Sequence, residues 1–355
     1  MKSPKNWQFL IKKIPLIFKI PNKNQFHPPQ TLYSMLGSPI IFCYKQLNSL
    51  LGVPMMILKK PVMALLLGML CIPAFAADAL GTKDNPVKIF FTPSVDANTI
   101  ATNSVSFLKF MEKETGLMFK SGIPSNYIAV VEAFGSERAD VAVMNSFGYL
   151  LANAKYGAEA KLKALRHGKD YYAGAIYVSE KSGIKTLKDL NGKKFAFTDS
   201  SSTSGYLYPL KIFNDAKIKI GNTTFAIKHD NVITMIYQGQ VDAGAAFYSD
   251  AFDGKIKDAR ERVLTQFPDV ETKVKVLKIT DKIPNDPFVF RKGLDPAITT
   301  KIIAALMKYI ESEEGKTTFK NIYAIDGIVP ATNKDYDSLR AVIKSTGTDV
   351  GALVK

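Results

Sequence analysis

The amino-acid sequence predicts an α/β fold built from two lobes, and three observations lead to this prediction. Short apolar runs typical of buried strands alternate with amphipathic segments from about residue 85 onward, which is the pattern of an α/β sheet. A segment that begins at Tyr127 has a counterpart that begins at His229. No low-complexity linker interrupts residues 85–355, so two lobes have to interleave along the chain.

The predicted strands are short runs of apolar and β-branched residues. They cover residues 87–92, 139–144, 171–178, 193–198, 226–228, 241–247, 273–279 and 288–290. One helix is predicted over residues 100–114, with Val105, Leu108 and Met111 at helical spacing on its apolar face and Gly116 just beyond its end. Further helices are predicted over residues 147–156 and from Pro296 onward, where the chain reads as helical.

The basic character of the chain is concentrated at its start. The whole sequence has 47 Lys and Arg against 32 Asp and Glu, a formal net charge of +15. Residues 1–76 hold nine lysines and no acidic residue, which leaves 38 basic and 32 acidic residues, a net charge of +6, in the rest. A nucleic-acid-binding function loses its main support, and no nucleic-acid partner is expected.

Residues 55–76 read as a cleaved export signal. Lys59 and Lys60 precede an apolar run over residues 61–72, and Ala74-Phe75-Ala76 supplies a small-residue cleavage site. The run is shorter than the roughly 20 residues that a membrane span needs. The mature protein is therefore expected to begin near Ala77 and to be periplasmic.

Residues 1–54 are expected to be an upstream extension outside the mature protein. Export signals normally begin near the start codon, which favours Met55 or Met56 as the true start. An unusual pre-extension of the signal remains the alternative for residues 1–54, and a buried core helix remains the alternative for the apolar run over residues 61–72. A lipoprotein anchor at Cys71 is disfavoured because the large Leu70 precedes the cysteine.

Cysteine content narrows the chemistry of the mature chain. Cys43 and Cys71 are the two cysteines, and both precede Ala77. Disulfides, thiolate zinc sites and cysteine nucleophiles are excluded from residues 77–355 on this reading. We expect no catalytic residues, no metal and no cofactor.

An internal repeat supports the two lobes. Tyr127 starts a helical segment that ends in glycine, and Asp140 follows 13 positions later at the start of an apolar run. His229 starts a similar segment, and Asp242 follows it at the same spacing. Any βα fold can repeat this pattern; the alternative is two similar lobes that each aim one polar ring at a shared cleft.

Residues 198–205, with the sequence TDSSSTSG, form the strongest chemical feature. They follow a predicted strand and precede an amphipathic stretch over residues 206–213. Hydroxyl groups and free N–H groups at a helix start can bind an anion, and no Lys or Arg stands among them. Pro209 fits such a helix only near its first turn. A serine-rich cap without a ligand is the alternative.

The chain resembles the periplasmic substrate-binding proteins of phosphonate, phosphite and phosphate ABC transporters (the PhnD-like family) over residues 85–340. The matching segments are Ser125-Asn126-Tyr127, residues 140–149, Tyr171-Tyr172, residues 202–206, His229 and residues 283–287. The resemblance implies a type II periplasmic binding fold, in which two α/β lobes joined by two crossover strands close over the ligand.

The resemblance also implies roles for individual residues. Ser202, Thr203 and Ser204 would donate hydrogen bonds to the oxygens of the anion. Tyr127 from the first lobe and His229 from the second would donate from opposite walls of the cleft.

Three further positions complete the implied site. Tyr171 would line the pocket, with Tyr172 as the other candidate because strand alternation lets only one point inward. Asp286 would accept a proton from the ligand or pair with a ligand amine. Family members that take aminoalkyl phosphonates carry a carboxylate where Ser249 aligns here, one position before Asp250. An amine-bearing ligand is therefore in doubt.

The implied organisation places residues 77–172 and 289–355 in one lobe and residues 173–288 in the other. The implied function is capture of a phosphorus oxyanion by a monomer and its delivery to an ABC permease in the inner membrane. A ligand-binding subunit for sensing remains an alternative. A secreted hydrolase of small anionic substrates is a second alternative, although no G-x-S-x-G elbow is present.

Overall fold

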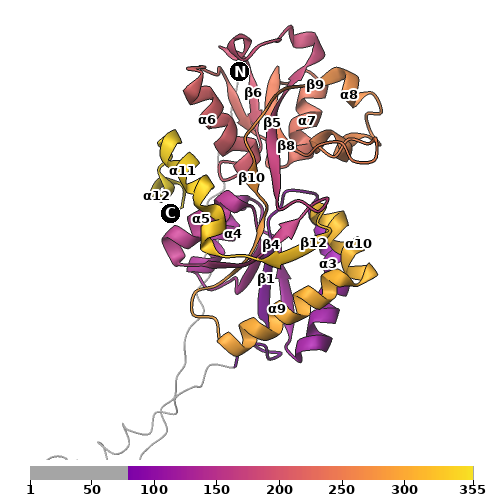
Figure 1. Cartoon of the computed structure of the whole chain (residues 1–355), viewed down its shortest axis with the longest axis vertical. Coiled ribbons are helices and arrows are strands. Elements are labelled where there is room, and N and C mark those ends of the chain that lie inside the picture. The colour runs from indigo at the N-terminus through magenta and orange to yellow at the C-terminus, as the bar shows by residue number, and fades with distance from the viewer. Residues whose placement is uncertain (1–78, 355) are drawn as a thin grey trace, which may run out of the picture. The chain divides into compact units, whose positions relative to one another are not determined.

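The computed structural model describes residues 79–354, which fold into two six-stranded mixed sheets, each with its own helices (Figure 1). The expected export signal over residues 55–76 and the expected extension over residues 1–54 lie outside the described residues. A search of the described helices found none with the length and apolarity to cross a membrane. We call the parts built on the two sheets the first and the second lobe.

The first lobe is built on a sheet with the strand order β12-β4-β11-β3-β1-β2. Its strands are β1 (Val87–Phe91), β2 (Phe119–Gly122), β3 (Val141–Val143), β4 (Glu159–Leu165), β11 (Pro287–Phe290) and β12 (Gly327–Pro330). Its helices are α3 (Ala97–Thr115), α4 (Tyr127–Gly135), α5 (Ser146–Tyr156), α9 (Pro296–Glu311) and α10 (Glu313–Tyr323). Strands β2, β4 and β12 were not predicted, and β12 interrupts a stretch that was expected to be helical throughout.

The second lobe is built on a sheet with the strand order β10-β5-β8-β6-β7, and β9 also pairs with β5. Its strands are β5 (Tyr171–Ser179), β6 (Phe195–Phe197), β7 (Thr223–Phe225), β8 (Ala243–Tyr248), β9 (Val274–Ile279) and β10 (Ile283–Pro284). Its helical elements are η2 (Glu180–Ser182), η3 (Leu187–Leu190), η4 (Thr203–Leu207), α6 (Tyr208–Asp215), α7 (His229–Tyr237), η5 (Ala259–Val263) and α8 (Val270–Lys273). The strand expected over residues 226–228 instead ends at Phe225.

The chain passes between the two sheets over residues 166–170 and again over residues 285–286. Both passages come before the expected boundaries at residues 172 and 288. Tyr171 and Tyr172 already pair with β10 in the second sheet, whereas Phe288 pairs with β3 in the first. Strand pairing, which joins segments far apart in sequence, sets these positions.

The C-terminal segment contacts both lobes. It comprises η6 (Asn333–Tyr336), α11 (Asp337–Thr346) and α12 (Val350–Leu353). Helix α11 packs against α5 of the first lobe and α6 of the second, between which it lies in Figure 1. Leu339 is buried in one apolar cluster with Val131 and Leu207, so residues 337–346 do not belong to the first lobe alone as expected.

The repeated segments are structural equivalents in the two lobes. Asp140 exchanges hydrogen bonds with Lys88, the second residue of β1. The Lys88 N–H donates to the Asp140 carboxylate at 3.0 Å, and the Asp140 N–H donates to the Lys88 carbonyl at 3.0 Å. Asp242 and Lys194 repeat the exchange in the second lobe at 2.9 and 3.1 Å. Tyr127 and His229 are each the first residue of the preceding helix, α4 and α7. The prediction of two similar lobes is confirmed.

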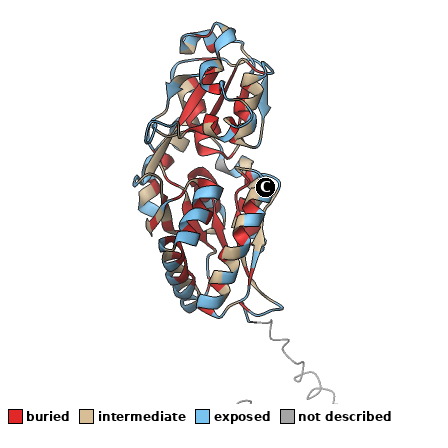
Figure 2. Cartoon of the chain, turned by 90° about the vertical axis from the view of Figure 1, so that its right-hand side faces the viewer, coloured by how far each residue is buried: buried red, intermediate tan, exposed pale blue. Residues whose placement is uncertain are grey.

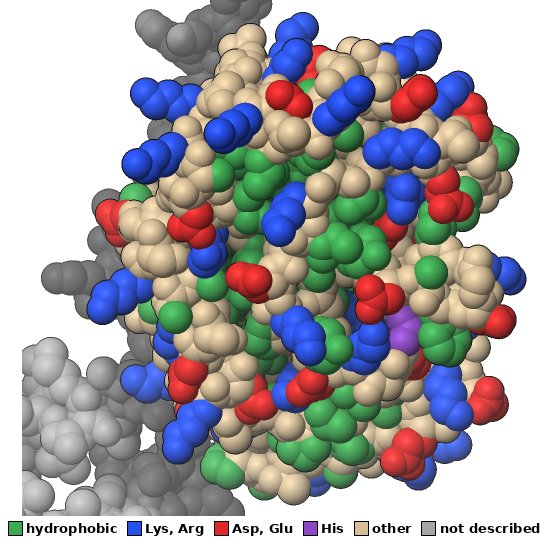
Figure 3. Space-filling view, turned by 45° about the horizontal axis from the view of Figure 1, so that its top comes forward, with side chains coloured by type: hydrophobic (Ala, Val, Ile, Leu, Met, Phe, Trp, Pro, Cys, Tyr) green, Lys and Arg blue, Asp and Glu red, His purple; other side chains and the backbone are tan. Residues whose placement is uncertain are grey.

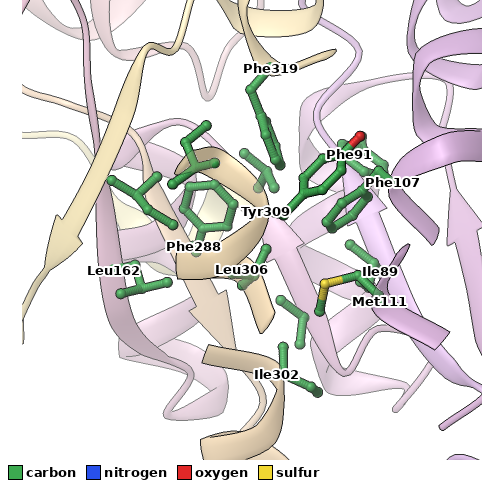
Figure 4. Close-up of a cluster of buried hydrophobic side chains, with 14 of the residues drawn as sticks. Ile89, Phe91, Phe107, Met111, Leu162, Phe288, Ile302, Leu306, Tyr309 and Phe319 are labelled. Atoms are coloured by element: carbon green, nitrogen blue, oxygen red, sulfur yellow. The ribbon is translucent and has the colours of Figure 1, made fainter. Parts of the chain in front are cut away.

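An aromatic cluster forms the core of the first lobe (Figure 4). The Phe107 ring on α3 lies 5.3 Å from the rings of both Tyr309 and Phe319, measured between centroids. Figure 2 shows the buried ribbon concentrated inside each lobe, with exposed segments outside it. Met111 is buried as predicted, whereas Val105 is 52% exposed, so its predicted place on the apolar face is wrong. The buried positions of α3 are Ile100, Ser104, Phe107, Met111 and Thr115.

Candidate functional site

A cavity of about 850 Å³ is lined by residues of both lobes and of the two passages between them. Five of the seven predicted site residues border it: Tyr127, Ser202, Ser204, His229 and Asp286. Thr203 and Tyr171 do not border it. These five come from α4, the serine-rich turn, α7 and the second passage, so the packing of the lobes brings them together.

Tyr127 presents an unpartnered hydroxyl at this cavity. The residue is 2% exposed, and its buried hydroxyl has no hydrogen-bond partner within residues 79–354. Burial raises the pKa of Tyr127 well above its ordinary value, and the charge of Asp199 adds to this effect. The phenol therefore stays protonated and can donate a hydrogen bond to an anion.

His229 is also a neutral donor. Burial lowers its pKa from 6.5 to about 3, and the nearby charges of Arg262 and Arg166 lower it further. The Phe247 N–H donates to Nδ1 of the imidazole at 3.2 Å. The proton of the neutral ring therefore resides on Nε2, which is the nitrogen left to donate to a ligand.

The buried neutral state of His229 predicts a pH-dependent stability. As the pH falls below about 6.5, the imidazole of the unfolded chain takes up a proton, whereas the folded imidazole stays neutral down to about pH 3. Protonation thus favours unfolding across this window, by at most about 1.4 kcal/mol per pH unit. Urea unfolding from pH 7 to pH 4 should show a smaller loss of stability for His229→Gln than for the unaltered protein.

His167→Gln is the matched control: burial also lowers the pKa of His167, but this residue is only half-buried, whereas His229 is 8% exposed. It should follow the pH curve of the unaltered protein more closely than His229→Gln does. Parallel curves for the unaltered protein and His229→Gln would contradict the assignment of a neutral buried imidazole.

The serine-rich segment forms a π-helical turn, η4, that continues into α6. Ser202 caps it by accepting a hydrogen bond from the Gly205 N–H at 3.1 Å. Pro209 falls in the first turn of α6, as predicted. Gly205 is required here because a Cβ at this position would lie 2.2 Å from Oγ1 of Thr198. Irregular helical turns of this kind are frequent at functional sites.

Thr203 faces the first lobe instead of the cavity. Its hydroxyl accepts a hydrogen bond from the Phe147 N–H at 2.9 Å and lies 3.2 Å from the Ser146 hydroxyl. Asn145, the N-cap residue of α5, makes no side-chain cap hydrogen bond. Thr203 therefore caps α5 from the other lobe, and the expectation that its hydroxyl binds the anion does not fit this geometry.

Replacing Thr203 by Val should destabilise the protein by about 1–3 kcal/mol, because it leaves the buried Phe147 N–H without an acceptor. Urea denaturation measures the change. Thr223→Val, at an exposed position of β7, is the isosteric control and should change stability by less than about 0.5 kcal/mol. If Thr203→Val were as stable as the unaltered protein but lost ligand binding, the hydroxyl would belong to the ligand site.

Tyr172, the other candidate, takes the place that was expected for Tyr171. Tyr172 borders the main cavity with its ring 5.5 Å from the guanidinium of Arg166. Tyr171 borders a neighbouring cavity of about 340 Å³, and the Lys282 ammonium lies 4.1 Å from its ring centroid. Successive side chains of β5 point to opposite faces, so only one of the two can line the main cavity.

Asp286 stands in the second passage and is held by the first. Nη2 of Arg166 donates to Oδ2 of Asp286 at 2.6 Å, and Nη1 donates to the Asn285 side chain at 2.8 Å. The Arg166 and Asp286 side chains are 12% and 19% exposed. Oδ1 of Asp286 is buried and has no hydrogen-bond partner among the described residues. It is an acceptor placed where a ligand could donate a proton.

Two arginines at the cavity are candidate functional residues that sequence reasoning missed. The serine-rich segment has no cation of its own, but Arg166 and Arg262 border the same cavity. The signal for Arg166 was its place five residues before Tyr171, in the passage that joins the predicted lobes. No comparable signal marked Arg262. The described residues hold no group of three or more His, Cys, Asp or Glu side chains that could bind a metal ion.

A family model described as the periplasmic phosphonate substrate-binding protein of ABC transporters matches residues 89–336. The phosphate-import protein PhnD of Mycolicibacterium smegmatis is 28% identical over 280 residues, which cover 72% of this chain and 84% of that protein. The phosphonates-binding periplasmic protein of Escherichia coli is 24% identical and is matched over 61% of this chain and 64% of its own length.

Two solved structures share the fold. A binding-protein component of an ABC phosphonate transporter from Pseudomonas aeruginosa has a TM-score of 0.64 at 18% identity, covering 74% of this chain and 86% of that one. PhnD1 from Prochlorococcus marinus, in complex with methylphosphonate, has a TM-score of 0.64 at 19% identity, and the match covers 74% of this chain and 98% of that one. These likenesses confirm the type II periplasmic binding fold, two α/β lobes joined by two crossover segments.

Proposed function

Since the chain belongs to the family of periplasmic phosphonate substrate-binding proteins of ABC transporters, we propose that it captures a phosphorus oxyanion in the cavity between its lobes. The ligand is a phosphonate, phosphite or phosphate, which the protein delivers as a monomer to an ABC permease in the inner membrane. The observation that carries the proposal is the pair of buried unpartnered polar atoms at the cavity, the Tyr127 hydroxyl and Oδ1 of Asp286.

The donors and the acceptor at the cavity match the chemistry of a partly protonated phosphorus oxyanion. Tyr127 and His229 offer neutral donors from the two lobes, and Ser202 and Ser204 offer hydroxyls. Oδ1 of Asp286 can only accept a hydrogen bond when ionised. A P–OH group supplies a proton for it, since phosphate-type ligands have a second pKa near 6. Sulfate at neutral pH has no proton to offer, which makes this carboxylate a repulsive element against it.

The names of the matched proteins support the same class of ligand. The relative from Mycolicibacterium smegmatis is named a phosphate-import protein, and the structure from Prochlorococcus marinus contains methylphosphonate. Family members are solute-binding proteins, and we propose the same non-enzymatic role here. Acidic and basic side chains are interspersed on the face in Figure 3, which fits a soluble carrier better than a nucleic-acid-binding surface.

Calorimetry on residues 77–355 tests the proposal with phosphate, phosphite, methylphosphonate, sulfate and taurine at neutral pH. At least one phosphorus compound should bind, and sulfate and taurine should bind at least tenfold more weakly. Tyr127→Phe should weaken the best ligand because it removes one donor, by about 0.5–3 kcal/mol. Tyr237→Phe, which removes an exposed hydroxyl that donates to Asp269, is the matched control and should leave binding unchanged. Binding of sulfate with equal affinity would refute the proposal.

We also propose that residues 55–76 direct export and are removed after Ala76, in keeping with the periplasmic location of the family. N-terminal sequencing of the exported protein should begin near Ala77. A mature protein that retained residues before Met55 would exclude this processing.

A further inference from the structure

The cavity is larger than a lone oxyanion requires. Its volume of about 850 Å³ lies in the range of roughly 300–1,000 Å³ typical of sites for larger organic ligands. A water molecule occupies about 30 Å³ in the liquid, so a tetrahedral oxyanion of five heavy atoms fills on the order of 100 Å³. Space therefore remains for a substituent on the phosphorus.

The cations around the cavity differ in whether a protein group already neutralises them. Arg166 forms an ion pair with Asp286 at 2.6 Å, and Lys257 forms one with Glu261 at 2.5 Å. Arg262, Lys255 and Lys320 also border the cavity, and none of these three side chains forms an ion pair within residues 79–354. Arg262 is the arginine among them, and its guanidinium accordingly has no ion-pair partner there. An arginine with five N–H donors and no partner at a ligand cavity is a strong candidate for binding an anionic group.

Arg262 lies beside the residues that we assign to the phosphorus oxyanion. It belongs to η5, which packs against α7, and His229 is the first residue of α7. Arg262 is exposed, yet enough protein surrounds its guanidinium that burial lowers its pKa; the charge of Glu261 counteracts this effect, and the charge of Arg166 adds to it. Glu261 and Asp230 are near enough for their charges to act on Arg262, but neither forms an ion pair with it in the described structure, and Glu261 pairs with Lys257 instead. The positive charge of Arg262 is therefore left for a ligand to neutralise.

We propose that the cavity takes a phosphorus oxyanion that carries a second anionic group on a short linker, and that Arg262 binds this second group. The inference rests on the proposed function, because the first group is the oxyanion held by Tyr127, His229 and the serine-rich turn. A carboxylate is the simplest second group, since an arginine can bind it through two parallel hydrogen bonds. An ammonium group in the same place would be repelled by Arg262.

Calorimetry at neutral pH with three probes tests the inference: methylphosphonate, 3-phosphonopropionate and 2-aminoethylphosphonate. The unaltered protein should bind 3-phosphonopropionate at least tenfold more tightly than methylphosphonate, and 2-aminoethylphosphonate no more tightly than methylphosphonate. Arg262→Gln should reduce the preference for 3-phosphonopropionate over methylphosphonate at least fivefold. Lys255→Gln removes the same charge from an exposed lysine at the same cavity and should keep the preference within twofold.

The outcomes separate this inference from the proposed function. If methylphosphonate binds and 3-phosphonopropionate binds no better, the second anionic group is refuted while the proposed function stands. If the preference survives unchanged in Arg262→Gln, Arg262 is not its receptor and the inference fails. If none of the three probes and neither phosphate nor phosphite binds, the proposed function and the inference fall together.

Discussion

Replacing Asp286 by Asn is expected to weaken binding of the preferred phosphorus oxyanion by about 1.5–3 kcal/mol, the scale of a hydrogen bond to a charged group. The Asp286 carboxylate presents an unpartnered Oδ1 at the cavity, while Arg166 donates a hydrogen bond to Oδ2. The substitution removes the charged acceptor for a P–OH proton. It also frees Arg166 from its ion pair and supplies an amide that can donate. Sulfate should therefore bind the variant better than it binds the unaltered protein.

Calorimetry of both proteins at neutral pH measures the ratio of phosphorus-ligand to sulfate affinity, which should fall in Asp286→Asn. Asp250→Asn is the matched control, because it removes the same charge from a side chain that is 69% exposed and lies outside the main cavity. It should leave the ratio within about twofold, as expected for a screened surface charge. An unchanged ratio in Asp286→Asn would show that this carboxylate does not set selectivity.

Replacing Phe107 by Ala is expected to reduce the free energy of unfolding by about 3–5 kcal/mol. Phe107 is 1% exposed and contacts the rings of Phe91, Tyr309 and Phe319, which join α3, β1, α9 and α10. Truncation leaves a cavity that this rigid cluster cannot fill. The lost free energy of burying the ring and the free-energy cost of the cavity therefore add. Urea denaturation measures the loss.

Val105→Ala on the same helix is the control, because Val105 is 52% exposed and its truncation leaves no internal cavity. Its effect should stay within about 0.5 kcal/mol. Equal losses for the two variants would mean that the sequence-based assignment of Val105 to the apolar face was right and the packing of α3 described here is wrong.

The alternation of strands and helices was determined by the sequence itself, because it depends on the spacing of apolar residues within short segments. The glycine end of α3 at Gly116 and the place of Pro209 in the first turn of α6 followed from local backbone rules. The equivalence of Tyr127 and His229 also followed, because each starts a unit of the same length. Local patterns failed for β2, β4 and β12, which are short or carry lysines between their apolar residues.

The tertiary structure alone decided which side chains meet. The ion pair of Arg166 with Asp286 joins residues 120 positions apart, and Thr203 caps a helix 56 positions away. Such contacts depend on how the two lobes pack, since no pattern within a short segment encodes the position of a distant partner. The same packing leaves Arg262 unpaired at the cavity, assigns Tyr172 rather than Tyr171 to its wall, and makes α11 a contact of both lobes. The kinds of residue that form the site could therefore be predicted from the sequence, whereas the partner of each residue is set only when the two lobes pack together.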